Sequence, residues 1–305
     1  MTYFKTLFLS TLIAGLGACS SGTESGPSPE APSFDTAAMD KLLSSAVENG
    51  EVIGVQALVF DEGQTVYRNS FGLADRERNT PVKSDTVYRV YSMTKPLTSA
   101  LIMDLREDGK LKLSDPASKY IPQLGQMKVV SLGADGQPKY DAQTRPMTIE
   151  DLLLHRSGMA YGIFGGNPIE DAWAGAGMFD PQTSMAENMD KLPMLPLLGQ
   201  PGEQWFYSYS IDILGRIAEV ITGQTLGEAM NERFFEPLGM TETSFTVPAA
   251  RKARFASNYM LQADGSFILA EDGQTSPFTQ PAKFQSGGGG LTSTTDDWLK
   301  FARLL

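Results

Sequence analysis

The spacing of apolar residues between positions 39 and 72 changes from a helical period to a strand period. At 39–50 apolar residues recur three and four positions apart and Gly50 ends the run, which predicts a helix. At 52–72 two stretches rich in Val, Phe and Tyr flank a typical turn sequence, Asp-Glu-Gly at 61–63. We therefore predict a helix followed by two strands joined at that turn.

A second apolar run begins after Ser92. Its apolar residues cover nearly every helical face up to Gly109, which predicts a helix that is buried on most sides. Further along, Thr148 is followed three residues later by Asp151, and this pair is an acidic variant of the capping box. The pair predicts that another helix begins at Thr148.

Two more helices are predicted at 210–223 and 225–240. Gly223 and Gly239 stand where these helices should end, because glycine adopts the left-handed conformation of a C-terminal cap without strain. The whole region from about 110 to 250 therefore reads as helix and loop.

Strand-like segments return at 255–260 and 266–269. Strands that come first, helices between them and strands at the end indicate an α/β (α+β) chain, in which a sheet carries an inserted, mostly helical region.

Residues 1–19 are predicted to be a targeting signal. Lys5 precedes an apolar run at 7–16, which is too short for a comfortable membrane span. The end of this run, Leu16-Gly17-Ala18-Cys19, resembles a bacterial lipobox, and the resemblance implies that Cys19 is lipidated. A plain signal peptide with an incidental cysteine is the alternative.

The residue after the cysteine is Ser20, where a signal for retention in the inner membrane would have Asp. The lipobox resemblance therefore implies the outer membrane. We therefore expect a chain of the bacterial cell envelope, held to the membrane by lipid and facing the periplasm. Residues 20–35 are rich in Ser, Gly and Pro and are predicted to be a flexible tether. The folded domain is expected at 36–305.

Charge and composition exclude several kinds of function. The net charge is −11 and the pI about 4.7, which disfavours a nucleic-acid partner because phosphates need clustered Lys and Arg. One His and one Cys leave no His/Cys metal cluster, so we expect no metal and no cofactor. A carboxylate site for Mg or Ca stays open, although the chain has no D-x-D-x-D-G loop.

The candidate chemistry lies at the start of the second apolar run. Ser92 and Lys95 share a helical face three residues apart. A serine hydroxyl needs a neighbour that takes its proton, and here the base is either a neutral lysine or a tyrosine tuned by that lysine. The simpler alternative is that Ser92 only caps the helix and Lys95 is solvated.

Several segments, taken together and in order, resemble the class C β-lactamase-like superfamily, and the S-M-T-K form at Ser92 resembles its family VIII esterases. The others are "LLLHRSGM", "PGEQWFYSYSIDILG", "FFEPLGMTETSF" and "GGGGLTSTTDDWLKFARLL". The resemblance covers about 40–305. It implies a β-lactamase/transpeptidase-like fold, with an antiparallel sheet flanked by helices, and it implies that Tyr207 is the catalytic tyrosine.

The same resemblance assigns His155 to a structural turn. The chain has no G-x-S-x-G elbow that would support a Ser-His-Asp site. Trp205 and Tyr209 are expected to bind substrate by lining the pocket, although each could simply pack. Asp212 is interpreted as a carboxylate that favours a helix start.

The chain departs from the family pattern in two places. Class C β-lactamases have an asparagine two residues after the catalytic tyrosine, where this chain has Tyr209, and that shifts the expectation from β-lactams toward esters. The family's third motif, Lys-Thr-Gly or a substitute such as His-x-Gly, is also missing. We therefore expect the hydrolase domain to be incomplete at its C-terminus, which leaves the activity of this chain open.

The resemblance implies a serine hydrolase that acts through an acyl-enzyme. Esters are the favoured substrates, followed by β-lactams and peptidoglycan-like D-Ala-D-Ala peptides. A non-catalytic binding or scaffold module of the cell envelope is the alternative from another functional class.

Overall fold

The computed structural model describes residues 34–132 and 137–305. The predicted signal, Cys19 and nearly all of the tether lie outside these residues. Within the described ranges, no helix is both long enough and apolar enough to cross a bilayer.

The helices and strands alternate along the chain with the helices concentrated in its middle. The α-helices are α1 (Thr36–Glu48), α2 (Thr94–Glu107), α3 (Ile149–Leu153), α4 (Pro168–Gly175), α5 (Met185–Met189), α6 (Ser210–Thr222), α7 (Leu226–Met230), α8 (Glu236–Leu238) and α9 (Thr295–Ala302). The strands are β1 (Gly54–Asp61), β2 (Gln64–Asp75), β3 (Thr80–Pro81), β4 (Tyr88–Arg89), β5 (Val129–Leu132), β6 (Pro138–Asp141), β7 (Asn258–Leu261), β8 (Phe267–Glu271) and β9 (Thr292–Ser293).

The predicted hairpin at 61–63 is confirmed. Asp61 pairs with Gln64 across a two-residue loop. Glu62 and Gly63 both have positive φ, 43° and 84°, which matches the right-handed twist of the two strands. β3 extends this antiparallel sheet, and the remaining strands form the antiparallel pairs β4–β9, β5–β6 and β7–β8.

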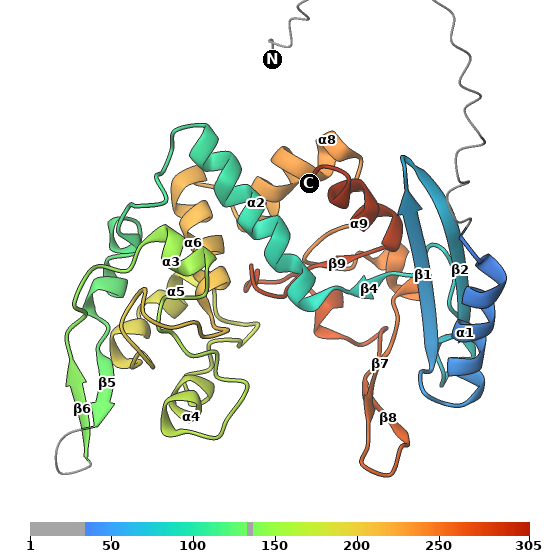
Figure 1. The fold of residues 1–305 in the computed structure, drawn as a ribbon, viewed down its shortest axis with the longest axis horizontal. Helices are drawn as coiled ribbons and strands as arrows, with labels where there is room; N and C mark the ends of the chain where they lie inside the picture. The colour runs from blue at the N-terminus through green and yellow to red at the C-terminus, as the bar shows by residue number, and fades with distance from the viewer. Residues whose placement is uncertain (1–33, 133–136) are drawn as a thin grey trace, which may run out of the picture. The chain divides into compact units, whose positions relative to one another are not determined.

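The sheet of β1 and β2 is covered by helices. α1 packs against both strands, and α9 contacts β1 from the other side (Figure 1). α2 lies between this sheet and the helical region, where its main helical partner is α6 (Figure 1). The structure thus has the α+β organisation that the sequence predicted, with helices that flank an antiparallel sheet.

The helix after Ser92 is present as α2, but it is not buried on every face. Leu97, Leu101 and Leu105 are fully buried, whereas Ala100 and Met103 are only partly covered. Ala100 still packs against the core from the edge of the buried face, so α2 is buried deeply along one face and only partly elsewhere.

The middle of the chain contains a hairpin that the sequence pattern did not predict. β5 and β6 pair in antiparallel register, from Val129 opposite Asp141 to Leu132 opposite Pro138. β6 is largely exposed and polar, so it lacks the alternation of apolar and polar residues that marks a half-buried strand.

The predicted ends of the helices are confirmed. Thr148 and Asp151 form a reciprocal capping box at the start of α3. Gly223 and Gly239 follow α6 and α8 in the left-handed conformation, with φ of 73° and 67°.

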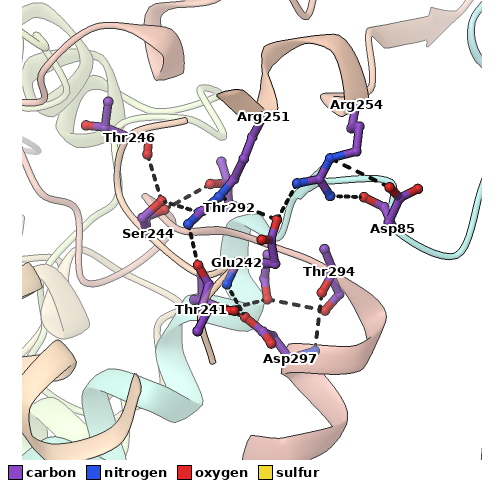
Figure 2. Close-up of polar contacts among 12 residues, drawn as sticks. Asp85, Thr241, Glu242, Ser244, Thr246, Arg251, Arg254, Thr292, Thr294 and Asp297 are labelled. Carbon is purple, nitrogen blue, oxygen red and sulfur yellow. Dashed lines mark hydrogen bonds and ion pairs between the residues drawn. The ribbon is translucent and has the colours of Figure 1, made fainter. Parts of the chain in front are cut away.

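A polar network ties the segment after α8 to β9 and α9 (Figure 2). Ser244 and Thr292 exchange two backbone hydrogen bonds. The buried carboxylate of Asp297 accepts the Glu242 N–H at 2.6 Å, and Glu242 in turn binds Arg254 at 2.6 Å. Because β9 pairs with β4, this network also holds the glycine-rich loop, Gly287–Gly290, beside the start of α2.

Candidate active site

The serine stands on a short turn that leads into α2. Tyr91, Ser92 and Met93 form one turn of 3₁₀-helix, and Tyr91 has a positive φ of 41°. A non-glycine residue in this region is strained, and such residues concentrate at functional sites. The turn leaves Ser92 exposed at the N-terminal end of the helix, where the helix dipole favours negative charge.

Lys95 lies one turn further along α2 and is buried, with 8% of its surface exposed. Its Nζ donates to Ser92 Oγ at 3.2 Å, to Tyr161 Oη at 3.1 Å and to the Gly288 carbonyl at 2.7 Å. Each ammonium proton can therefore find an acceptor. The alternative of a solvated Lys95 does not hold.

Tyr207 approaches the serine from the segment before α6. Its Oη lies 2.7 Å from Ser92 Oγ, although the two residues are 115 positions apart. Lys95 Nζ lies 4.6 Å from the centroid of the Tyr207 ring. The structure thus brings together the three residues that the motifs singled out.

Two further side chains complete this cluster, and the sequence analysis missed the role of both. Tyr161 contacts Lys95, and burial raises its pKa far above the ordinary value for tyrosine, with the nearby Asp212 adding to the shift. Nothing in the spacing of Tyr161 distinguishes it from a core tyrosine, so only the fold reveals its place.

Asp212 is wholly buried, and its role goes beyond a helix-start carboxylate. Its Oδ1 accepts from Ser286 Oγ at 2.5 Å and from the Gly288 N–H at 3.1 Å, while Oδ2 has no hydrogen-bond partner. Burial raises its pKa, since a carboxylate loses its hydration there. Because the Gly288 carbonyl in turn accepts from Lys95, Asp212 positions the lysine through that residue.

Glycine is required at position 288. A Cβ built there would lie 2.4 Å from Asp212 Oδ2 and 3.1 Å from Tyr161 Oη. The glycine-rich loop therefore allows a close approach that a side chain would prevent.

His155 packs against Tyr207, and its hydrogen bond is with Ser208 and not with Ser92. Its Nδ1 accepts from the Ser208 N–H at 3.2 Å, and its ring lies 4.9 Å from the Tyr207 ring. Burial, with a smaller contribution from the Lys95 charge, lowers its pKa to about 4. A neutral His155 can keep Nδ1 free as the acceptor.

The expected lining roles of Trp205 and Tyr209 are not found. Tyr209 is completely buried between Trp173 and Phe179, and its hydroxyl donates to the Met178 carbonyl at 3.1 Å. It faces inward because it packs at the start of α6. Trp205 is 64% exposed and lies beside Tyr207 on the outside of the site.

A cavity of about 800 Å³ opens beside Ser92 and Tyr207. This volume is within the usual range for sites that bind small molecules. A lysine and a tyrosine thus converge on one serine hydroxyl at a helix start, next to a cavity. Such an arrangement can transfer an acyl group.

The fold and this cluster together define the class of serine β-lactamase-like proteins. Residues 39–305 match the family model "Beta-lactamase". The chain belongs to this family, which comprises serine hydrolases and acyltransferases.

Among its relatives, Protein Rv1367c of Mycobacterium tuberculosis is 37% identical over 86% of this chain and 64% of its own length. Esterase EstB of Burkholderia gladioli is 30% identical over 89% of this chain and 71% of its own. A solved structure, "EstCE1, a hydrolase with promiscuous acyltransferase activity", is 26% identical with a TM-score of 0.72, over 87% of this chain and 71% of its own. The chain therefore spans about two thirds of the length of these relatives.

Proposed function

We propose that this chain is a serine esterase that forms an acyl-enzyme on Ser92. The observation that carries the proposal is the convergence of Tyr207 Oη, at 2.7 Å, and Lys95 Nζ, at 3.2 Å, on the Ser92 hydroxyl. Both groups donate to Ser92 Oγ, and Tyr207 Oη becomes a proton acceptor for this hydroxyl when the tyrosine is ionised beside the positive charge of Lys95.

The reaction has two matching halves. In this mechanism Tyr207 reacts as the phenolate, beside the Lys95 ammonium: its Oη takes the Ser92 proton as Oγ attacks the ester carbonyl carbon and forms a tetrahedral intermediate. The intermediate collapses to the acyl-enzyme and expels the alkoxide, which takes the proton back from Tyr207. A water molecule then repeats the sequence and releases the acid. The Lys95 ammonium and the N-terminus of α2 stabilise the negative charge that develops in each half.

Two observations favour esters over β-lactams and D-Ala-D-Ala peptides. Two of the relatives are described as an esterase and as a hydrolase with acyltransferase activity. In addition, Tyr209 occupies the position of the asparagine of class C β-lactamases and is buried, so it offers a substrate amide no partner. A non-catalytic envelope module is the alternative that the following experiment also tests.

The proposal is tested by labelling the chain with a fluorophosphonate and mapping the adduct by peptide mass spectrometry. We expect the adduct on Ser92 and none in Ser92→Ala. Ser286→Ala is the matched control, since Ser286 is the other serine that lines the cavity, and this variant should still carry its label on Ser92. An unlabelled Ser92 in the folded chain would favour the non-catalytic module.

The roles of Lys95 and Tyr207 are tested by kinetics on p-nitrophenyl butyrate. Tyr207→Phe removes the proton acceptor and should lower kcat about 10²–10⁴-fold. Lys95→Ala should have a comparable effect, and the double variant should lose little more, because groups that act as one unit are not additive. Multiplicative losses in the double variant would show that the two residues act separately.

A further inference from the structure

The wall of the cavity beside Ser92 consists wholly of uncharged residues. It comprises five phenylalanines, three tyrosines, three prolines, three glycines and single Ile and Ala residues, together with two glutamines, two serines and one threonine. Such a lining, mainly apolar with a few polar groups, is typical of a site for an uncharged ligand.

Lys95, which contacts three of the lining residues, does not alter this conclusion. Lys95 Nζ already donates to Ser92, Tyr161 and Gly288, so a carboxylate in the cavity would compete with these acceptors. Moving a charged group from water into this cavity without a partner costs a free energy on the order of several kcal/mol or more. Moving an apolar group into the same cavity is favourable.

The rim of the cavity carries two apolar side chains that the protein leaves uncovered. Ile163 and Phe164 line the cavity, yet they are 57% and 61% exposed. The Phe164 ring lies 6.1 Å from the Tyr161 ring and 6.2 Å from the Tyr207 ring, so it stands directly beside the reacting groups.

The segment that carries these side chains is anchored at one end. The buried carboxylate of Glu170 accepts the N–H groups of Tyr161 and Gly162, at 3.2 and 2.6 Å. Gly162 also packs closely on α4, whereas Gly165 and Gly166, on the other side of Phe164, have open space where a side chain would be. The anchor therefore fixes the backbone directly before Ile163 and Phe164, at the entrance to the cavity.

We propose that the cavity binds the larger apolar part of an uncharged ester and that Ile163 and Phe164 are specificity-determining residues that cover it. This inference rests on the proposed esterase function and names its substrate class. The two side chains gain burial only when an apolar group enters, so part of the binding free energy depends on the size of that group.

The first experiment compares kcat/KM of the chain for matched esters. Methyl 4-phenylbutyrate enlarges the acyl part of methyl acetate, and 3-phenylpropyl acetate enlarges its alcohol part. We expect at least one of them to exceed methyl acetate by about tenfold or more. Methyl 4-(4-carboxyphenyl)butyrate adds a negative charge to the enlarged acyl group. If the enlarged acyl group gives the higher kcat/KM, the charged ester should show no such increase over methyl acetate. If the enlarged alcohol gives it, 3-(4-carboxyphenyl)propyl acetate is the charged ester for the same comparison.

The second experiment assigns the preference to the rim. The measured quantity is the ratio of kcat/KM for the preferred large ester to kcat/KM for methyl acetate. This ratio should fall about tenfold in the double variant Ile163→Ala/Phe164→Ala and by a smaller factor in Phe164→Ala. Met194→Ala is the matched control, because Met194 is 78% exposed but does not line this cavity, and its ratio should match that of the wild type.

The outcomes distinguish the proposed preference for large apolar esters from the proposed esterase function. Hydrolysis of methyl acetate that depends on Ser92, with no preference in either ester series, would overturn the inference and leave the esterase function standing. A size preference that survives in the double variant would overturn the role of Ile163 and Phe164. A chain that neither labels at Ser92 nor hydrolyses any ester would overturn both.

Discussion

Backbone strain at single residues marks the proposed site. Among the described residues, four that are not glycine have positive φ: Glu62, Asn79, Tyr91 and His155. Glu62 belongs to the loop between β1 and β2, and Asn79 lies just before β3. Tyr91 directly precedes Ser92, and the His155 ring packs on that of Tyr207. Conformations of this kind persist only where the surroundings hold them, at a cost of about 1–3 kcal/mol each.

The chain's single histidine makes a testable contribution to the pH dependence of stability. In the unfolded chain His155 takes up a proton near its ordinary pKa of 6.5, whereas in the folded chain it stays neutral until about pH 4. The unfolded state therefore binds more protons between these values. Folding stability should fall by up to about 1.4 kcal/mol per unit as the pH is lowered through this window.

The measurement is urea unfolding of the wild type and of His155→Gln at pH 7.5 and pH 5. The wild type should lose about 2 kcal/mol more than the variant between these two values, because glutamine does not titrate. The carboxylates titrate equally in both proteins and cancel. Equal losses would show that His155 is not held neutral.

Helix ends are decided by short stretches of chain, which is why they could be predicted. Gly223 ends α6 with a φ of 73° and has no atom near the position of a missing Cβ. Gly175, at the end of α4, has the same open space but a φ outside the left-handed region. The two glycines therefore differ in conformation and not in crowding.

Substituting alanine at both glycines separates these effects. Gly223→Ala should destabilise the fold by about 1 kcal/mol, the cost of placing an L-residue in the left-handed region. Gly175→Ala should be neutral or stabilising by up to about 1 kcal/mol, because alanine is the better helix former. Thermal melts of both variants provide the comparison, and equal shifts in Tm would contradict it.

Across the whole molecule, one buried arginine links the serine segment to the far wall of the cavity. Arg89, three residues before Ser92, is 3% exposed and pairs with Glu271 on β8. Its guanidinium lies 4.1 Å from the centroid of the Phe255 ring and 5.7 Å from that of Phe278, which lines the cavity. This contact joins segments that are more than 150 residues apart.

Breaking this buried pair should be costly. Arg89→Leu leaves the Ser276 hydroxyl as the remaining side-chain partner of the Glu271 carboxylate, which is 28% exposed, and we expect a loss of about 2–3 kcal/mol in the free energy of unfolding. Arg68→Ala is the matched control, since Arg68 and Asp296 pair at the surface with 33% and 45% exposure, and it should cost less than about 1 kcal/mol. Similar losses in both variants would mean that the burial of Arg89 adds nothing.

The sequence by itself determined the features of this protein that depend on interactions between neighbouring residues. The loop at 61–63, the cap at Thr148 and the meeting of Ser92 with Lys95 each depend on residues at most a few positions apart. Backbone geometry and side-chain reach decide such features without help from the rest of the chain. The family motifs then predicted the fold class, because they describe its segments in order.

The tertiary structure alone decided which residues meet across the chain. Tyr207 and Tyr209 stand two positions apart, and only packing at the start of α6 turns the first toward Ser92 and the second into the core. Tyr161 and Asp212 join the site because distant elements bring them to Lys95 and to the loop at Gly288. Contacts of this kind depend on the burial of many side chains at once, so no short stretch of sequence contains them.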